Sequence, residues 1–288
     1  MREISVKRFL INWIAPLAIA FVLVWMLRLL VIEFYYVQNN SMKPSIEKGD
    51  LVMVNKFKVI KRNTLIAFYY PLEKNSTISS KSILLKRCVA LPGDTLIINN
   101  GKLTINSVLQ PDSFCLYNYR ILIFDSLENK ALINNYKLVK GYTDKMDLIV
   151  PLSERQYQKI KSDSIIRYIQ SVKDEKDLNH PSIFPHSYLY RWNKDFFGPL
   201  VVPKKGSIVT ITKKNMALYK RVLTVYEGNT VKITGDVIYI NNKKADYYTF
   251  KQNYVMVLND YRDNADDSRQ WGFVPQNHII GKVTMIWK

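Results

Sequence analysis

A long run of apolar side chains lies near the start of the chain. From Phe9 to Leu27 there is no charged residue, and the run extends to Ile32 if Arg28 is tolerated. A helix needs about 20 apolar residues to cross a bilayer, and a buried core helix seldom runs this long without a charge. The pattern therefore predicts a transmembrane helix over residues 9–32.

The residues on either side of this run indicate its orientation in the membrane and whether it is cleaved off. Arg2, Lys7 and Arg8 precede it, so the positive-inside rule places residues 1–8 in the cytoplasm and the rest of the chain across the membrane. A removable signal has a shorter apolar region followed by small residues, whereas a glutamate and three aromatic residues stand at 33–36. We therefore expect a permanent anchor.

The remainder of the chain begins and ends with short runs rich in β-branched and apolar residues. Gly-Asp pairs, which favour turns, separate several of them, for example at 49–50 and 93–94. The runs that predict strands lie at 51–54, 82–85, 207–211, 230–233 and 254–258. We expect a mostly β fold.

The middle of the chain differs in composition, because Tyr, Asn, Asp and Lys become frequent there. Ser153 and Gln156 have the spacing of a helix capping box, and Ile165, Ile169 and Val172 recur at helical spacing. This pattern predicts a mixed α/β insert with one or two short helices. The expected divisions are a cytoplasmic N-terminus 1–8, an anchor 9–32, a first β part 33–106, the insert 107–197 and a second β part 198–288.

The chain is strongly basic, with 42 Lys and Arg against 24 Asp and Glu and a formal net charge of +18. The basic residues are spread along the chain, and no zinc-finger, recognition-helix or aromatic RNA-binding motif gathers them. We therefore expect no nucleic-acid partner. A basic surface beside anionic phospholipid fits the anchor, and a merely solvated basic face stays open as the alternative.

Cysteine and histidine are too sparse for a disulfide scaffold or a metal site. Cys88 and Cys115 are the only cysteines, so a single bridge and two buried thiols both stay open. The three histidines, His180, His186 and His278, are scattered. We expect no metal and no cofactor.

Three segments contain residues suited to chemistry. Ser41 lies in a polar loop shortly after the apolar run, Lys86 lies in an apolar strand before a Pro-Gly turn, and a dense run of charges covers 259–269. A desolvated lysine becomes neutral more easily and can then take a proton from a serine hydroxyl. Each segment alone has a simpler reading, namely a turn serine, a lysine that points to solvent with Leu85 inside, and a solvated loop.

Together and in this order, the three segments resemble the type I signal peptidases. The matching elements are Ser-Met-x-Pro, Lys-Arg-x-x-x-Leu-Pro-Gly-Asp and Arg-Asp-Asn-x-x-Asp-Ser-Arg, and the resemblance covers the anchor, 37–71, 83–98 and 259–283. Residues 192–199 also resemble a segment of the large-insert members. The resemblance implies a β catalytic region in an inner-membrane serine endopeptidase, with that region periplasmic or extracytoplasmic. Its substrates would be exported preproteins, cut after an Ala-x-Ala signal.

The resemblance also implies a role for particular residues. Ser41 matches the nucleophile and Lys86 its unprotonated general base, while the Ser41 N–H and the Asn39 side chain would hold the oxyanion. The substrate would lie extended beside Leu84 and Leu85 as an added strand. The residues that match the shallow substrate pockets are Val37, Met42, Ile46 and Leu85. Those that match the supporting charged loop are Asp260, Arg262, Asp267, Ser268 and Arg269.

Two departures from the family pattern bear on activity. The usual Gly-Asp-Asn-Arg opening is Asn-Asp-Tyr-Arg at 259–262, and Ala265 stands where the family commonly has a serine that hydrogen-bonds the lysine. The alternative is therefore a non-catalytic structural or binding subunit of an envelope complex. A self-cleaving regulator with a Ser-Lys pair is disfavoured by the anchor. The Ser-x-x-Lys match from Ser45 to Lys48 is short enough to arise by chance and lacks companion motifs.

Overall fold

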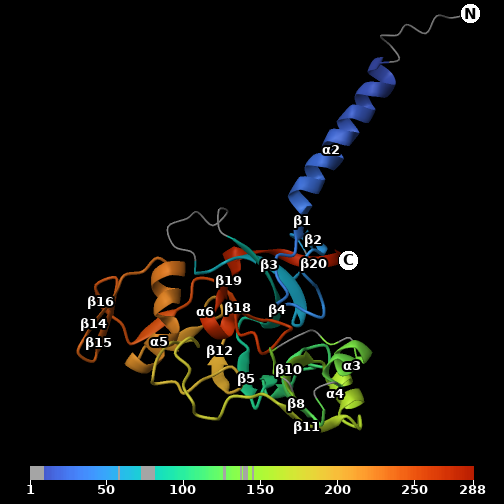
Figure 1. Cartoon of the computed structure of the whole chain (residues 1–288). Coiled ribbons are helices and arrows are strands. Elements are labelled where there is room, and N and C mark those ends of the chain that lie inside the picture. Colours follow the sequence, from blue (N-terminus) through green and yellow to red (C-terminus); the bar gives the residue numbers. More distant parts are fainter. Residues whose placement is uncertain are drawn as a thin grey trace, which may run out of the picture.

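A computed structural model describes residues 10–57, 59–72, 82–125, 128–136, 138, 142–144 and 146–288. Figure 1 shows a β-rich body from which one helix projects at the N-terminal end. The prediction of a mostly β fold is confirmed, since the described part of the body contains three sheets of four or more strands, two smaller sheets and only short helices. The elements keep the labels of Figure 1.

The largest sheet has seven strands and contains both ends of the β-rich body. Its spatial order is β1 (Ile32–Tyr36), β2 (Leu51–Asn55), β20 (Ile279–Trp287), β3 (Thr64–Tyr69), β4 (Ile83–Ala90), β18 (Tyr254–Leu258) and β19 (Val274–Pro275). All its pairings are antiparallel. In β2, Val52 and Val54 are buried while their neighbours are half-buried, the alternation that a strand with one core face requires. The strands predicted at 51–54, 82–85 and 254–258 are thereby confirmed.

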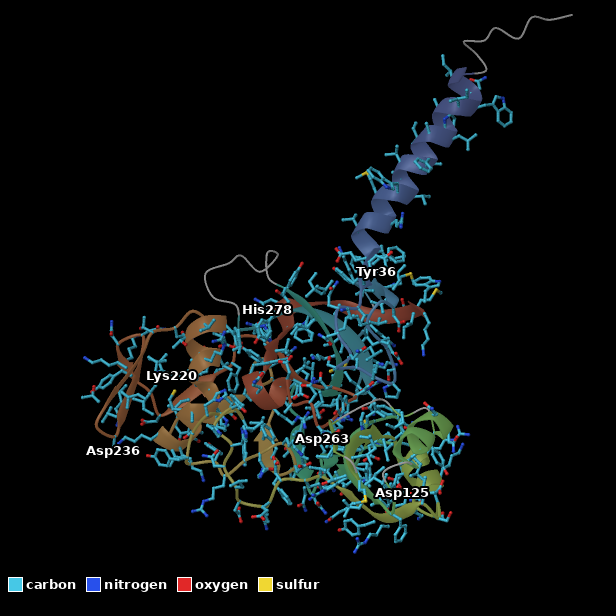
Figure 2. All side chains as sticks on the ribbon, viewed as in Figure 1. Tyr36, Asp125, Lys220, Asp236, Asp263 and His278 are labelled. Atoms are coloured by element: carbon cyan, nitrogen blue, oxygen red, sulfur yellow. The ribbon has the colours of Figure 1, made fainter. Side chains whose placement is uncertain are left out.

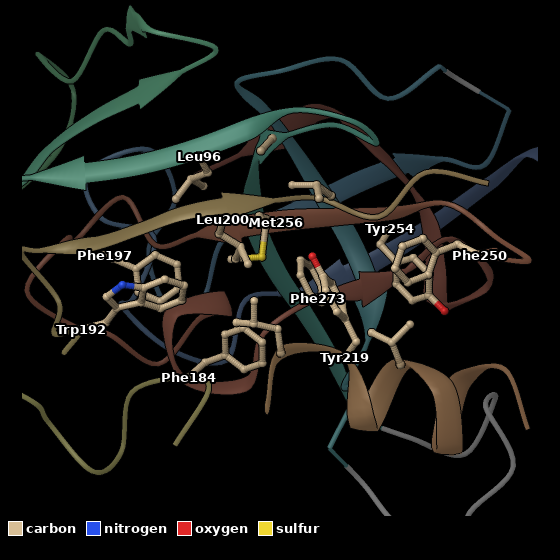
Figure 3. Packing of buried hydrophobic residues seen from close by; sticks show 14 of the residues in the cluster. Leu96, Phe184, Trp192, Phe197, Leu200, Tyr219, Phe250, Tyr254, Met256 and Phe273 are labelled. Carbon is tan, nitrogen blue, oxygen red and sulfur yellow. The ribbon is translucent and has the colours of Figure 1, made fainter. Parts of the chain in front are cut away.

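A second sheet packs against the first through the main hydrophobic core. It contains β12 (Phe197–Val201), β5 (Thr95–Asn99), β6 (Lys102–Ile105) and β7 (Val108–Leu109), in that order. Leu96, Leu200, Tyr254, Met256 and Phe273 meet in this core, part of which is shown in Figure 3. Strands from both ends of the chain therefore share one interior.

The C-terminal half adds a smaller unit on one side of this core. Its elements are β13 (Ile208–Thr210), α5 (Lys213–Arg221), the π-helix η3 (Val222–Tyr226), β14 (Val231–Thr234), β15 (Val237–Ile240), β16 (Lys243–Lys244) and β17 (Tyr247–Thr249). The predicted strands at 207–211 and 230–233 are confirmed. Helix α5 was not predicted; Thr212 and Asn215 form the capping box that begins it.

Residues 107–197 include a sheet with its own core. The sheet order is β11 (Ile166–Ser171), β8 (Tyr117–Ile123), β10 (Asp147–Leu152) and β9 (Tyr142–Asp144), accompanied by α3 (Glu128–Asn135) and α4 (Glu154–Ile160). The predicted capping box is confirmed, because Ser153 Oγ accepts from the Gln156 N–H and begins α4. The domain boundaries stay a prediction.

The helical spacing of Ile165, Ile169 and Val172 was misleading. Residues 166–171 form β11, which pairs antiparallel with β8 through a register irregularity near Tyr168. Long-range pairing outweighs a local periodicity of three residues, and isoleucine and valine fit a pleated surface well. This part of the insert is therefore strand and not helix.

The N-terminal helix is continuous from the π-helical turn η1 (Leu10–Ile14) through α2 (Ala15–Val31) into β1. Figure 1 shows it standing clear of the body. No helix among the described residues has both the length and the apolar character that a membrane crossing requires. Residues 1–8 and Phe9 lie outside the described part of the chain, and the transmembrane anchor stays a prediction.

The last two helical elements lie at and after the end of the charged loop 259–269. They are α6 (Ser268–Trp271), capped by the Asp267 side chain, and the 3-10 turn η4 (Gln276–His278), which leads into β20. Gly272 follows α6 with φ +84°, and a Cβ there would lie 2.6 Å from the Phe184 ring. A side chain at 272 would therefore be both strained and crowded, which explains the glycine.

Candidate active site

Ser41 and Lys86 come together although 45 residues separate them in sequence. The Lys86 Nζ lies 3.0 Å from the Ser41 Oγ, and both side chains are buried, with 1% and 5% exposure. Ser41 stands in the turn after β1, and Lys86 stands on β4. A distance within hydrogen-bond reach is the first geometric requirement for a nucleophile and its base.

The alternation of β4 explains why Lys86 points inward. Lys86 shares a face with Cys88 and Ala90, which are also buried, whereas Leu85 is only half-buried. The Lys86 Nζ also lies 6.0 Å from the centre of the Trp271 ring. The reading in which Lys86 points to solvent is therefore excluded.

Burial is the main influence on the Lys86 amine. It lowers the pKa of Lys86 below the ordinary 10.5, and Arg269 acts in the same direction, while the carboxylates of Asp267 and Asp266 oppose it. A neutral amine at moderate pH is the state in which a lysine accepts a proton.

Asn39 is in direct contact with Ser41. Its Oδ1 accepts hydrogen bonds from the Ser41 N–H at 3.1 Å and from the Ser41 Oγ at 2.7 Å. The amide therefore presents its oxygen, not its NH₂ group, to the nucleophile in this structure. The donor role predicted for Asn39 requires the amide to turn, so that role stays a prediction.

An apolar cleft of about 390 Å³ reaches Lys86 and is also lined by Asn39 and Met42, on either side of Ser41 in sequence. Val37, Met42 and Leu85, three of the four predicted pocket residues, line it. The fourth, Ile46, does not; it is fully buried and packs in the cluster that holds Val37 and Met42. The cleft lies between residues 34–39 and residues 83–86, so the large sheet must curl until β1 approaches β4.

The edge of β4 beside this cleft offers backbone groups. Residues 83–88 pair with β3 on one side, whereas β18 pairs on the other side only from Arg87 to Ala90. Within the described part of the chain, no strand pairs with Ile83 to Lys86 on that second side. An extended peptide in the cleft would find unpaired strand edge there.

Arg87 and Asp260 form a buried ion pair next to the pair of Ser41 and Lys86. Arg87 Nε and Nη2 contact the two Asp260 carboxylate oxygens at 2.6 and 2.5 Å, and Asp260 is fully buried. The Ser45 hydroxyl donates to Asp260 at 2.5 Å, and Lys48 is exposed. The Ser-x-x-Lys pattern is therefore not assembled into a site.

The loop at 259–267 and the start of α6 surround a second ion pair. Arg269 Nη2 lies 2.7 Å from Asp267 Oδ2, and both residues are buried. Burial alone would raise the pKa of Asp267, but Arg269 and two backbone N–H groups hold it below its ordinary value. Ser268 Oγ accepts from the Val257 N–H at 3.0 Å, so its role is in holding α6 against β18.

The same loop contacts the nucleophile through its backbone. The Tyr261 N–H donates to the Ser41 carbonyl at 3.1 Å, and the neighbouring Arg262 N–H donates to the Leu116 carbonyl at 2.8 Å. The Arg262 guanidinium also donates to the Cys115 sulfur at 3.2 Å. Sequence reasoning did not find the part played by Tyr261 and Leu116, because backbone contacts leave no sequence signal.

Both cysteines are free and buried, so the possibility of a bridge between them is excluded. Burial raises the pKa of Cys88 to about 12, and it also raises the pKa of Cys115. Both thiols therefore behave as small apolar side chains.

The departures noted in the sequence have structural consequences. Ala265 is half-buried and packs against the main core. Asn259 replaces the usual glycine, and its Nδ2 donates to the carbonyls of Asn264 and Asp266 at 2.7 and 3.2 Å. The Asn259 side chain thus fixes the backbone on both sides of Ala265.

A buried amine beside a serine hydroxyl, at the end of an apolar cleft with an open strand edge, is the arrangement of a serine hydrolase that takes an extended substrate. The sequence profile of the family described as signal peptidase, peptidase S26, matches residues 10–119 and 246–288. The chain therefore belongs to the signal peptidase family, peptidase S26. Membership of this family makes it a serine protease.

Individual relatives agree with the profile. The chain is similar to signal peptidase I of Buchnera aphidicola subsp. Baizongia pistaciae, at 25% identity over 284 residues, covering 92% of this chain and 73% of the relative. It is 22% identical to signal peptidase I of Buchnera aphidicola subsp. Acyrthosiphon pisum over 98% of this chain and 76% of the relative. Signal peptidase I P of Bacillus subtilis subsp. natto matches at 32% identity over 109 residues, 36% of this chain and 55% of the relative. These similarities do not favour the alternative of a non-catalytic subunit.

Proposed function

We propose that this chain removes signal peptides from exported preproteins, with Ser41 as the nucleophile and Lys86 as the general base. The observation that carries the proposal is the 3.0 Å distance between the Lys86 Nζ and the Ser41 Oγ in a buried setting. An exposed lysine would be protonated at neutral pH and could not act as a base. Burial lowers the pKa of Lys86 and so supports this role.

The proposed reaction has two halves. Neutral Lys86 takes the Ser41 hydroxyl proton as Oγ attacks the scissile carbonyl carbon. The Ser41 N–H, once released from the Asn39 oxygen, donates to the oxygen that becomes negative. Collapse of this intermediate breaks the C–N bond, and the protonated Lys86 donates its proton to the departing amine. Water then hydrolyses the acyl-enzyme with Lys86 again as base.

The proposed substrate lies extended between residues 34–39 and residues 83–86. The open edge of β4 supplies main-chain hydrogen bonds, and the apolar cleft receives alternate side chains of the peptide. Val37, Met42 and Leu85 leave room only for small groups near Ser41 in this proposal, which fits cleavage after an Ala-x-Ala sequence. Asp260, Arg262, Asp267, Ser268 and Arg269 support the site without contacting the peptide.

The proposal includes a membrane anchor formed by residues 9–32 at the N-terminal end. The apolar side chains of α2 are exposed around the helix, for example Leu17 at 68%, Phe21 at 72% and Leu23 at 61%. A helix that is apolar on all sides needs an apolar surrounding. Because α2 leads directly into β1, this placement would hold the cleft close to the outer membrane surface, where preproteins emerge.

Cleavage of a preprotein tests this proposal directly. The purified full chain in detergent should release a mature protein that begins after the Ala-x-Ala sequence, as read by mass spectrometry. Ser41→Ala and Lys86→Met should each lower kcat about 10⁴-fold or more, since each removes half of a unit that acts together. Lys48→Met, which removes an exposed lysine of the same region, is the matched control. Cleavage by either active-site variant above a few per cent of wild type would contradict the assignment.

A further inference from the structure

A half-buried lysine of the segment before β12, Lys194, contacts the loop that supports the site. The Lys194 Nζ lies 2.7 Å from Asp263 Oδ1 and 2.6 Å from Asp195 Oδ2. The Lys194 side chain is 18% exposed, and those of Asp263 and Asp195 are 5% and 7% exposed. Figure 2 places Asp263 at the junction between the catalytic sheets and the insert.

Several further contacts tie this cluster to the same loop. The second Asp263 oxygen accepts from the Asn118 N–H of β8 at 2.6 Å, and the Tyr261 hydroxyl donates to the Asn118 side chain at 2.7 Å. The Lys194 carbonyl accepts from Arg269 at 3.3 Å. The insert thus contacts the loop at Tyr261, Asp263 and Arg269.

Two of these three loop residues, Tyr261 and Arg269, are one step from Ser41 and Lys86. The Tyr261 N–H donates to the Ser41 carbonyl, and Arg269 pairs with Asp267, the carboxylate with the strongest charge effect on Lys86. A displacement of the loop would therefore move Ser41 and the charges that act on Lys86 together. The ion pairs of Lys194 with Asp263 and Asp195 lie where they can limit that displacement.

Lys194 and Asp263 each favour the charged form of the other. Burial by itself disfavours the charge on both residues, yet Asp263 and Asp195 outweigh it at Lys194 and raise the pKa of that amine. At Asp263 burial raises the pKa of the carboxyl, and Lys194 opposes the rise. An ion pair shielded from water adds little net stability compared with apolar packing. Its main effect is therefore to fix the position of the loop that contains Asp263.

Lys194 lies outside the segments that the family profile matches, 10–119 and 246–288. Asp263 lies within them. The contact therefore links a region outside the matched segments with the common catalytic region.

We propose that Lys194 is a positioning residue for the peptidase reaction, which acts through Asp263 to hold the loop 259–269 against Ser41 and Lys86. The inference rests on the proposed function, and it gives the insert a part in catalysis. Lys194 touches neither the substrate cleft nor the catalytic pair.

The test compares Lys194→Met, Asp263→Asn, the double variant and the wild type, as full chains in detergent. With an Ala-x-Ala peptide, Lys194→Met should lower kcat by about 10- to 100-fold with KM changed less than threefold, because misplaced catalytic groups affect the transition state more than binding. The double variant should be no slower than Lys194→Met, because the two residues act as one unit and it leaves no unpaired buried charge at 263. Lys176→Met, at an exposed lysine of the same segment, is the control and should cleave like the wild type.

Two measurements separate the possible failures. Hydrogen exchange at residues 259–264 should become faster in Lys194→Met at a temperature well below its Tm, and the exchange of β10 should stay unchanged. If kcat and this exchange both match the wild type, the positioning role is overturned even if Tm falls. If the wild type itself cleaves nothing, the proposed function is overturned, and the exchange result alone still decides whether Lys194 holds the loop.

Discussion

The Asn39 side-chain oxygen accepts both hydrogen bonds that Ser41 can donate, from its N–H at 3.1 Å and from its hydroxyl at 2.7 Å. A backbone N–H is always a donor, so the amide must turn its oxygen toward Ser41 to avoid two facing donors. The N–H that would stabilise an oxyanion is therefore occupied before substrate binds. In the proposed mechanism, the substrate oxygen displaces the Asn39 oxygen, and the turned amide presents its NH₂ group to the new negative charge.

Two replacements at position 39 test this exchange of roles. Asn39→Ser should keep kcat within about tenfold, because a hydroxyl can rotate from acceptor to donor. Asn39→Asp should lower kcat about 10²- to 10³-fold, because an ionised carboxylate accepts the same bonds but cannot donate. Asn40→Asp, at the exposed neighbouring residue, controls for added charge. Equal kcat for Asn39→Asp and wild type would show that residue 39 makes no contact with the oxyanion.

The lowered pKa of Lys86 predicts how cleavage depends on pH. Only the neutral amine accepts the Ser41 proton, so kcat should rise with pH along an acidic limb whose midpoint lies below 10.5. Peptide cleavage measured from pH 5 to pH 10 gives this midpoint. A rate that is independent of pH from 6 to 10 would argue against a lysine base.

The lowered pKa of Lys86 also makes the free energy of unfolding depend on pH. Between the folded pKa and 10.5, the unfolded chain binds a proton at Lys86 that the folded chain does not bind. The free energy of unfolding should therefore fall as pH is lowered from 10.5 to the folded pKa. Denaturant unfolding of wild type and Lys86→Met across this window isolates the effect, since the methionine variant lacks this contribution.

Ala265 stands where the family commonly has a serine, and restoring that serine tests whether its hydroxyl would assist Lys86. If the family alignment holds, a hydroxyl at this position would bond the Lys86 amine and fix it toward Ser41. One restored hydrogen bond is worth about 0.5 to 1.5 kcal/mol, so Ala265→Ser should raise kcat roughly two- to tenfold. An unchanged kcat would mean that another group already orients the lysine, and a lower kcat would mean that residue 265 does not face Lys86.

The proposed orientation across the membrane can be measured with a thiol label. Gln38 is exposed, whereas Cys88 and Cys115 are buried, so a cysteine at position 38 should be the main reactive thiol. A membrane-impermeant maleimide should label Gln38→Cys in intact cells from the outer side of the membrane. Labelling only after the cytoplasmic face is opened would reverse the topology and remove the role in export.

Three strands of the large sheet, β2, β4 and β18, could be predicted because each carries its own local signal. In β2 and β18, β-branched residues between turn pairs indicate the strand without any knowledge of its neighbours. The inward direction of Lys86 could not be predicted, because alternation allows either Leu85 or Lys86 to face the core. The pairing with β3 and β18 decides that question.

Features that depend on distant partners were missed or misread. The spacing in residues 165–172 suggested a helix, but pairing with β8 makes these residues a strand. Lys194 and Asp263 are 69 positions apart, and the sequence shows two ordinary charged residues. Ile46 is apolar like the residues of the cleft, so only the three-dimensional packing separates it from them.

The main core limits how this enzyme can be shortened. Leu96 and Met256 belong to the segments common to the family, whereas Tyr219 and Phe197 come from the stretch between those segments, and all four pack in one cluster. Excision of residues 120–245 would uncover apolar faces of the strands that remain, and large exposed apolar patches promote aggregation. A compact reagent for crystallisation or inhibitor screening should therefore retain the stretch from residue 172 onward, even though the family can be recognised without it.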